Sequence, residues 1–318
     1  MNTDSSCEAA FARSGPFWHL YTDGEKMEMY FTGPSDFLFG LALLGICTAS
    51  FPHCRILTFA LMSNHLHLIV VGQEKDVRAF FALFKERLTR YLGGQHRFCR
   101  MQNFEAGLFQ IPDLRALRNE IIYVNRNGYV VSPDCTPFSY WWCAGMYFFN
   151  PMGWLLPSRT FASLTLRERR AMCHCRDVEF PPHYRVLANF CVGPGMAAEP
   201  MLLPTSFCAI REAESYFRDA HQYFRRLSRD QEAFSEVARR LGDRIFLTDE
   251  ELFGAVSALS AKEFGNSIPA LLPASVKQEV ARRMHYDYNA SNKQIQRILK
   301  LPPVLVGEWF PRARPILK

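Results

Sequence analysis

The chain has no Cys-x-x-Cys pair, although ten cysteines occur among its 318 residues. Structural zinc sites of the finger and ribbon types are built from such pairs, so this class of site is not expected. The closest grouping is Cys173-His174-Cys175, and these three neighbours cannot close a tetrahedral site by themselves. We therefore expect free, buried thiols in a reducing compartment, and a cytoplasmic protein.

The chain also lacks a stretch long enough to cross a membrane. Its most apolar run, Phe37–Phe51, is about fifteen residues long, shorter than the roughly 20 that a spanning helix needs. Residues 1–15 are polar and have no apolar core, so no secretory signal is expected. Hydrophobic residues make up 48% of the chain and charged residues 21%, which is typical of a globular protein. The net charge of +6 permits an anionic partner.

Hydrophobic patterns in the first half predict alternating strands and helices. Strands are expected at Phe17–Thr22, Arg55–Leu61, Met62–Val70 and Phe104–Phe109, with Met27–Phe31 as a short hairpin arm. Helices are expected from Ser35 or Asp36 to about Ser50, from a cap at Asp76 to about Leu92, and over Asp113–Asn127. This order predicts an α+β fold with a ferredoxin-like antiparallel sheet and two helices on one face. The third helix is then available to cover the other face.

A boundary is expected near Asn150–Pro157, which gives a first domain over residues 1–150 and a mainly α-helical region over residues 151–318. Helix-start signals in the second region are the capping-box pairs Ser228/Gln231, Thr248/Glu251 and Ser291/Gln294. The three predicted helices Ser275–Tyr286, Ser291–Leu299 and Pro302–Phe310 can form a helix-turn-helix unit at about residues 274–310. The competing interpretation is a helical packing domain.

The most informative motif is His65-Leu66-His67 at the start of a predicted strand. Alternate side chains of a strand point to the same face, so the two imidazoles are expected side by side. Two neutral imidazoles at that spacing can both bind one metal ion. An isolated motif of this kind is more often two polar residues on a half-exposed strand, so the prediction depends on residues further along the chain.

The predicted helix Asp113–Asn127 has two useful faces. One is the apolar stripe of Leu114, Leu117, Ile121 and Val124, and the second carries Ala116, Glu120, Tyr123 and Asn127. If this helix lies across the sheet, Asn127 can complete a His–His–Asn site for Mg²⁺ or Mn²⁺. Tyr123 then projects beside the metal, where its hydroxyl can attack a phosphodiester. Each residue alone has an ordinary explanation, as a packed aromatic or a helix-terminal residue, so the joint pattern carries the prediction.

With these residues the chain resembles the single-tyrosine HUH transposases, and among them the REP-associated tyrosine transposases (the group labelled transposase IS two-hundred-like). The resemblance covers about residues 15–145 in detail. It rests on the H-x-H strand preceded by Met62-Ser63-Asn64 and on Tyr123-Val124-Asn125-Arg126-Asn127. Supporting matches are Phe17-Trp18-His19 and Ser139-Tyr140-Trp141.

The resemblance implies that His65, His67 and Asn127 bind the metal and that Tyr123 is the nucleophile. The implied reaction is cleavage and rejoining of single-stranded DNA through a 5′-phosphotyrosine, often at imperfect hairpins near repeat ends. Related enzymes include dimers and monomers, so a homodimer is one expected state. One residue departs from the family pattern, because Gly128 replaces the proline that usually follows the asparagine. Glycine frees the backbone there, which bears on the placement of Asn127.

DNA contacts are expected from basic residues in both halves, and these are Arg78, Lys85, Arg87, Arg90, Arg282, Arg283, Lys293, Arg297 and Lys300. Solvated helix faces are the competing interpretation. Tyr140, Trp141 and Trp142 are candidates for stacking on bases, or for a packed hydrophobic lid.

Three alternatives are weighed against a transposase. A domesticated DNA-hairpin-binding protein without strand transfer would share the same motifs, with Gly128 as its sign. A histidine-triad hydrolase needs a third histidine at position 69, which is Ile69. An amidohydrolase barrel needs eight strand–helix units, and the patterns do not provide them.

Overall fold

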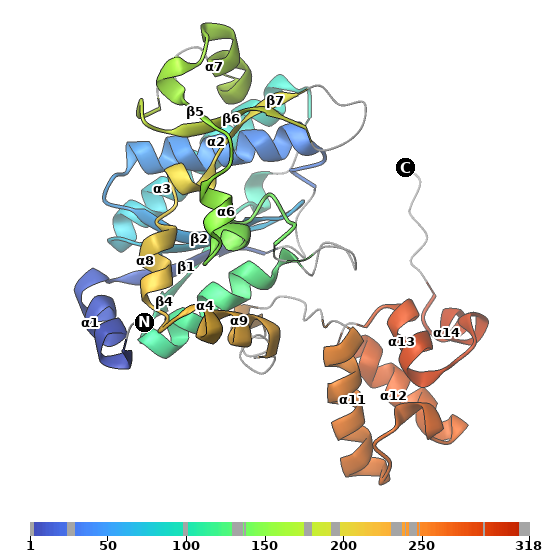
Figure 1. Ribbon diagram of the computed structural model, residues 1–318. Helices are drawn as coiled ribbons and strands as arrows, with labels where there is room; N and C mark the ends of the chain where they lie inside the picture. Colours follow the sequence, from blue (N-terminus) through green and yellow to red (C-terminus); the bar gives the residue numbers. More distant parts are fainter. Residues whose placement is uncertain are drawn as a thin grey trace. The chain divides into compact units, whose positions relative to one another are not determined.

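The computed structural model shows an α+β protein (Figure 1). It describes residues 3–23, 29–97, 101–128, 136, 138–174, 180–191, 198–229, 237, 238, 240, 241, 247, 249–288 and 290–311. The chain forms two compact units, Met1–Val237 and Ala238–Lys318. No helix in the described part of the chain is both long and apolar enough to cross a membrane.

The first unit contains most of the helices and all of the strands assigned within the described residues. In chain order they are α1 (Asp4–Ser14), β1 (Phe17–Thr22), α2 (Pro34–Ser50), β2 (Arg55–Leu61), β3 (Leu66–Val71), α3 (Glu74–Gly94), β4 (Ala106–Ile111), α4 (Leu114–Arg126), α6 (Pro151–Trp154), β5 (Arg159–Thr160), α7 (Leu166–Cys173), β6 (Arg185–Phe190), β7 (Glu199–Leu202), α8 (Ile210–Ser215) and α9 (Ala220–Arg229).

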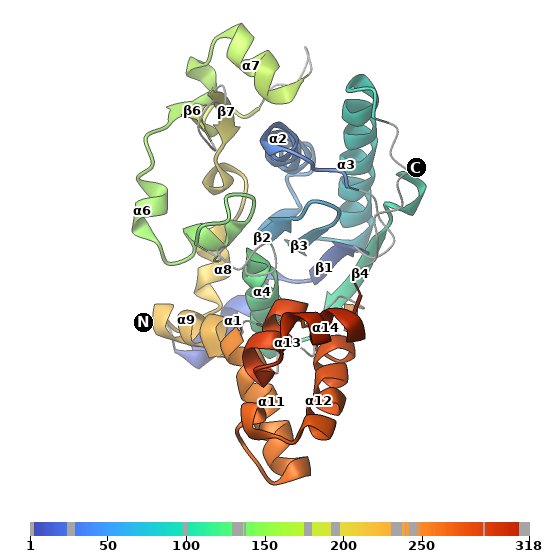
Figure 2. The same cartoon turned by 90° about the vertical axis from the view of Figure 1, so that its right-hand side faces the viewer.

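A four-stranded antiparallel sheet with the order β2-β3-β1-β4 is the centre of this unit. Helices α2 and α3 lie on one face of the sheet, and α4 lies on the other (Figure 2). The predicted order of strands and helices is therefore confirmed, including the helix that covers the second face. Side chains alternate along a strand, so His19 and Tyr21 of β1 lie on one face of the sheet and Leu20 lies on the other. The histidine side chains of β1 and β3 therefore face α4.

Several predicted boundaries are wrong by a few residues. Strand β3 begins at Leu66, so His65 precedes the strand instead of starting it. Helix α3 begins at Glu74 with Gln73 as its N-cap, and Asp76 lies in its first turn. Strand β4 ends at Ile111, two residues later than expected. These shifts arise because backbone pairing with a neighbouring strand, which the local pattern does not contain, decides where a strand starts and stops.

The predicted hairpin arm Met27–Phe31 is not a strand in its described part. The backbone N–H groups of Tyr30 and Phe31 both donate to the carbonyl of Ser63, at 2.9 Å each. Met27 and Glu28 lie outside the described residues. The segment therefore binds the turn between β2 and β3 instead of pairing with β1.

Helix α2 is buried on nearly all sides. It packs against α3 and β2 on one side and against β7 and α7 on the other. A Cβ atom on Gly45 would lie 2.3 Å from a methyl carbon of Leu202, so only glycine allows β7 to approach this closely. A helix that is apolar all round needs cover on two sides, and this explains why its sequence resembles a short membrane segment.

The second cover of α2 comes from a small sheet with the order β5-β6-β7. This sheet was not predicted, because β5 has two residues and β7 has four, and the Pro and Gly residues around them are typical of loops. The region after residue 150 is otherwise mainly helical, as expected.

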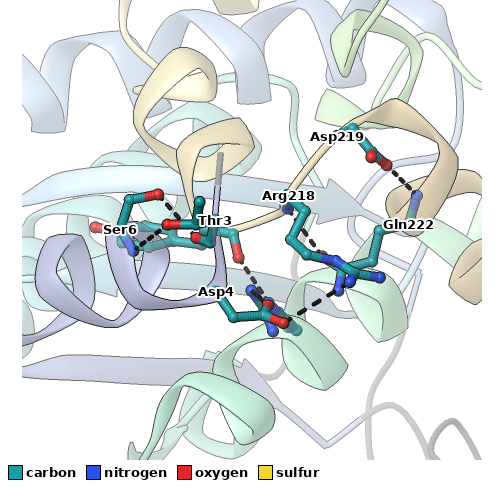
Figure 3. A network of polar contacts seen from close by, with 8 residues as sticks. Thr3, Asp4, Ser6, Arg218, Asp219 and Gln222 are labelled. Carbon is teal, nitrogen blue, oxygen red and sulfur yellow. Dashed lines mark hydrogen bonds and ion pairs between the residues drawn. The ribbon is translucent and has the colours of Figure 1, made fainter. Parts of the chain in front are cut away.

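Helix α4 is held by polar contacts with segments far away in the sequence. Buried Arg118 donates to the carbonyl of Tyr216 at 2.6 Å and contacts Asp4 of α1 at 3.3 Å. Figure 3 shows the same Asp4 beside Arg218, whose guanidinium lies 3.8 Å away. Buried Arg126 donates to the carbonyl of Leu227 in α9. Residues up to α9 therefore belong to the unit that contains the sheet, and this unit extends well past the expected boundary at residue 150.

The second unit has its own apolar core and contains α11 (Asp249–Phe264), α12 (Ala274–Tyr286), α13 (Asn292–Leu299) and α14 (Pro303–Trp309). The three helices predicted from Ser275 onward are confirmed. Ser291 and Gln294 form the predicted capping box at the start of α13. The other two predicted boxes include Gln231 and Thr248, which lie outside the described residues.

A buried carboxylate connects α2, α3 and the segment before α2. Asp36 accepts hydrogen bonds from the backbone and hydroxyl of Thr32, from the Tyr91 hydroxyl at 2.9 Å and from Arg97 at 2.7 Å. Burial alone would raise the pKa of Asp36, but these four donors outweigh it and lower the pKa below its usual value of 3.8. Arg97 also donates to the carbonyl of Tyr30, which in turn contacts the turn before β3.

We predict that a fragment of residues 1–237 folds cooperatively and that a fragment of residues 1–150 does not. The shorter fragment lacks β7, which covers α2, and α9, which covers α4. It would expose apolar helix surface and leave Arg118 and Arg126 without their carbonyl partners. Soluble yield and thermal unfolding followed by circular dichroism compare the two. A soluble 1–150 fragment with a sharp transition would contradict this.

We also predict that Asp36→Asn destabilises the protein at pH 7 and lowers the midpoint of urea unfolding. The loss of charge-assisted hydrogen bonds should reduce the free energy of unfolding by roughly 1–3 kcal/mol. Since the folded-state pKa of Asp36 is lowered, its contribution is fully present above pH 3.8 and decreases as the pH falls toward the folded-state pKa. The difference between the two proteins should therefore shrink in acid. Glu86→Gln, which removes an exposed ion pair with Arg90, is the matched control and should change little.

Candidate active site

His65 is positioned by the turn that joins β2 to β3. The backbone N–H of Met62 donates to the carbonyl of His65 at 2.8 Å and closes the turn. Leu66 N–H donates to the Thr22 hydroxyl at 3.1 Å, which ties the next residue to β1. The ring Nδ1 of His65 lies 2.7 Å from Oδ1 of Asn64. An amide oxygen only accepts, so Nδ1 carries the proton and Nε2 of His65 has the lone pair that a metal needs.

His67 lies inside β3 and is fully buried. Its ring centroid is 5.1 Å from that of His65, so the two imidazoles are adjacent although only one of them belongs to the strand. Burial, and then the nearby His19, lower the pKa of His67 well below 6.5. A neutral imidazole is the form that binds metal ions.

Helix α4 brings Tyr123 to the same place. The helix begins after Asp113, whose carboxylate accepts from the Ala116 N–H at 2.7 Å, and ends at Asn127, as the sequence predicts. The Tyr123 ring centroid lies 5.4 Å from that of His67 and 5.9 Å from that of His19. The packing of α4 on β2 and β3 therefore joins two motifs that are more than fifty residues apart.

Asn127 follows Tyr123 by one turn, at the C-terminal end of α4. Its Nδ2 donates to the carbonyls of Tyr123 at 3.1 Å and Val124 at 3.3 Å. The Oδ1 atom, which a metal ion would require, accepts no hydrogen bond from any described residue. Gly128 lies within the described residues and directly follows Asn127, the C-cap of α4.

The donor set fits a hard divalent cation in its chemistry. It combines two imidazoles with an amide oxygen, a mixture that suits Mg²⁺ or Mn²⁺ when further positions are filled by water or a phosphate. The described residues contain no group of three or more His, Cys, Asp or Glu side chains that could hold a metal, and this set has only two such residues. The amide of Asn127 would have to complete it.

The site is closed on most sides. Tyr123 is 2% exposed and Asn127 is 4% exposed, whereas His65 and the adjacent Asn64 are partly exposed. Among these four residues, His65 and Asn64 are therefore the ones that solvent reaches. The tyrosine hydroxyl becomes reachable only if the structure opens beside it.

Two buried residues of this site were not assigned a role from the sequence. Nε2 of His19, on β1, lies 3.1 Å from Nδ1 of His67. Nδ1 of the same His19 ring lies 2.6 Å from the carboxylate of Glu120. All three side chains are fully buried. The signal was present, because Glu120 shares a helix face with Tyr123 and His19 follows the aromatic pair Phe17-Trp18. What was missing was the pairing of β1 with β3, which places His19 beside the H-x-H motif.

The basic residues predicted to bind DNA in the first unit belong to α3, which lies on the face of the sheet opposite α4 (Figure 2). Arg78 pairs with Glu74, Lys85 with Glu105, and Arg90 with Glu86, so three of the four DNA contacts predicted on α3 are engaged by carboxylates. Arg87 and Arg90 line a cavity of about 250 Å³ together with Tyr91 and His174. Within the described part of the chain, the buried Nε of Arg87 has no hydrogen-bond partner.

Two of the three candidate stacking residues are part of the core. Trp142 stacks on Phe37 with ring centroids 5.0 Å apart, and the Tyr140 hydroxyl donates to the carbonyl of Leu61. Trp141 is partly exposed and packs edge-on against Phe190 at 4.9 Å. The packed interpretation therefore describes Tyr140 and Trp142, which cannot stack on a base in this conformation.

The basic residues of the second unit differ in their surroundings. Lys293 and Arg297 lie one turn apart on α13, Lys300 is its C-cap, and all three are exposed. Arg283 instead contacts Glu263 at 2.8 Å and Glu279 at 3.3 Å.

Arg282 is exposed and lines a second cavity of about 240 Å³ with Gln278, Tyr286 and Trp309. Helix α14 presents Val304, which is 72% exposed, and Glu308, so it offers few groups that read bases.

Comparisons with known proteins do not extend this picture. No family model matches the chain. No curated protein and no solved structure matches it either.

Proposed function

We propose that the protein is a metal-dependent single-strand DNA endonuclease and strand transferase of the single-tyrosine HUH type, related to the REP-associated tyrosine transposases. The observation that carries the proposal is the meeting of Tyr123 with the His65–His67 pair. The ring of His67 lies 5.1 Å from that of His65 and 5.4 Å from that of Tyr123. The strand order β2-β3-β1-β4, with α2 and α3 on one face, also supports the ferredoxin-like arrangement inferred from the sequence.

The chemistry follows from the side chains. The Tyr123 oxygen attacks the phosphorus of a DNA phosphodiester, the bond from phosphorus to the 3′ oxygen breaks, and the hydroxyl proton ends on that leaving oxygen. A 5′-phosphotyrosine and a free 3′ hydroxyl result, and attack by a 3′ hydroxyl reverses the step. A cation held by His65, His67 and Asn127, Mg²⁺ or Mn²⁺, would supply charge stabilisation at the phosphate.

The chain itself supplies orientation and exclusion of water. Helix α4 is fixed at both ends, so the Tyr123 ring has a defined position against the histidine-bearing strands. If the site closes again over bound DNA, the buried position of Tyr123 keeps water from competing with a 3′ hydroxyl for the phosphotyrosine. This favours rejoining of strands over hydrolysis.

The proposed substrate is single-stranded or hairpin DNA, and the second unit is the proposed duplex-binding part. In helix-turn-helix proteins the helix before the recognition helix crosses the DNA backbone. The exposed basic side chains of α13 suit that role, whereas α14 does not suit sequence reading. The unit would therefore contribute affinity more than specificity.

One observation favours a second candidate, a DNA-hairpin-binding protein that has lost strand transfer. Tyr123 is 2% exposed, so a phosphodiester cannot reach it without a conformational change. Gly128, in place of the proline typical of the resembling family, is consistent with relaxed constraint at the end of α4.

We predict that the full chain, incubated with Mn²⁺ and a labelled hairpin-bearing oligonucleotide, gives a covalent adduct that migrates slowly on a denaturing gel. Tyr123→Phe should abolish the adduct and keep the fold, because it removes only the hydroxyl. Tyr147→Phe, at another buried tyrosine, is the matched control and should retain the adduct. An adduct with Tyr123→Phe would refute the nucleophile. DNA binding without any adduct in the wild type would favour the second candidate.

We further predict that Lys293→Ala and Arg297→Ala each weaken DNA binding and flatten its salt dependence. Each lost phosphate contact should reduce the slope of log affinity against log salt by about 0.7–0.9. Arg283→Ala should leave the slope unchanged, since its guanidinium is engaged by Glu263 and Glu279. Fluorescence anisotropy at several salt concentrations measures all three. Equal slopes for the four proteins would exclude α13 from DNA contact.

A further inference from the structure

Beside the proposed ligands and nucleophile lies a continuous chain of buried polar side chains that ends on a metal ligand. It runs from Glu120 on α4 through His19 on β1 to His67 on β3. The distances are 2.6 Å from Glu120 Oε2 to His19 Nδ1 and 3.1 Å from His19 Nε2 to His67 Nδ1. All three residues are fully buried, so each would lose its hydration without these contacts.

The directions of these hydrogen bonds depend on which atoms can donate. A carboxylate only accepts, so Nδ1 of His19 must carry a proton and donate to Glu120. If His67 binds a metal through Nε2, its one proton lies on Nδ1 and is donated to Nε2 of His19, so His19 is neutral in that state and keeps its own proton on Nδ1 for Glu120. Nδ1 of His67 is already engaged, so Nε2 is the atom left to bind a metal.

We propose that Glu120 and His19 are positioning residues that fix the tautomer and ring orientation of His67, so that His67 binds the metal through Nε2. The inference rests on the proposed function, because it concerns the metal ligand of that site. Asn64 does the same for His65, whose Nδ1 it engages at 2.7 Å. Both histidines of the motif thus have an acceptor at Nδ1 and present Nε2.

The arrangement also gives the buried carboxylate of Glu120 a role near the proposed metal site. Glu120 contacts His19 and is not itself a proposed ligand. Metal-ligating histidines commonly donate their second N–H to an oxygen, which fixes the ring and raises its basicity. Here the carboxylate acts through an intermediate histidine. Since His19 joins β1 to β3 and Glu120 joins both to α4, the chain sets the ligand geometry and the helix position together.

The first test reads the tautomer directly. In the full-length, metal-free protein with ¹⁵N-labelled histidine rings, protonated and unprotonated ring nitrogens have well-separated chemical shifts. We expect His67, identified by the signals lost in His67→Gln, to be protonated at Nδ1 and unprotonated at Nε2. The opposite tautomer would overturn the proposal, since His19 would then have to donate to His67 and carry protons on both of its ring nitrogens.

The second test measures metal affinity. The double variant His19→Phe/Glu120→Leu removes both partners and leaves no buried unpaired carboxylate. Its affinity for Mn²⁺, measured from the free-ion signal in electron paramagnetic resonance, should fall about 10- to 100-fold, the range for losing a ligand's supporting contact. Excess Mn²⁺ should restore adduct formation, because the nucleophile is unchanged. Thr58→Val, which alters another buried polar contact between the sheet and α4, is the control and should bind Mn²⁺ normally.

The outcomes separate the proposed metal site from the role of the positioning pair. A wild-type protein that binds no Mn²⁺ would overturn the proposed metal site, and with it the role of the pair. Wild-type affinity in the double variant would overturn the inference and leave the proposed function standing. If the double variant does not fold, the tautomer of His67 in the wild-type protein still decides the question.

Discussion

The rest of the structure depends on how the polar side chains buried on α4 find partners. Four polar residues of this helix are almost inaccessible to water and bond to other elements, namely Arg118, Glu120, Asn125 and Arg126. A buried polar group without a partner costs roughly 1–3 kcal/mol, so four of them would offset most of the stability of a typical domain. Their partners come from β1, β2, α9 and the segment after α8. The helix can therefore occupy only the position in which all of these contacts form at once.

This constraint also determines the geometry of the candidate site. Glu120 meets His19 in the arrangement that places Tyr123 beside His67, so the contacts that stabilise the helix are those that align the proposed nucleophile. Asn125, on the adjoining side of the helix, is held between Thr58 and the Tyr223 hydroxyl. The same contacts leave the Tyr123 side chain 2% exposed, so the proposed nucleophile is aligned by the fold and also shielded from solvent.

The sequence was sufficient for features that depend on local pattern. The helix Asp113–Asn127 could be placed because Asp113 is an N-cap, and its two faces could be read from spacing alone. The strands Phe17–Thr22 and Arg55–Leu61 were also predicted to the residue. The role of His19 could not be predicted in this way, because it depends on the pairing of β1 with β3, which no local sequence pattern indicates. The small second sheet was missed for a related reason, because its short strands exist only through the surfaces that they cover.

The extent of the first unit is explained by the same reasoning applied to α2. A helix with apolar residues on every side cannot be satisfied by one sheet, so a second layer is required by the sequence of α2 itself. That layer is supplied by β7 and α7, and the chain after them returns to cover α4. Helices α2 and α4, on opposite faces of the sheet, therefore determine how much of the chain belongs to the unit. Helix α2 requires segments that bury its apolar residues, and α4 requires segments that pair with its buried polar residues. A boundary placed after the last motif residue separates both helices from their partners, which explains why motif spacing alone places it too early.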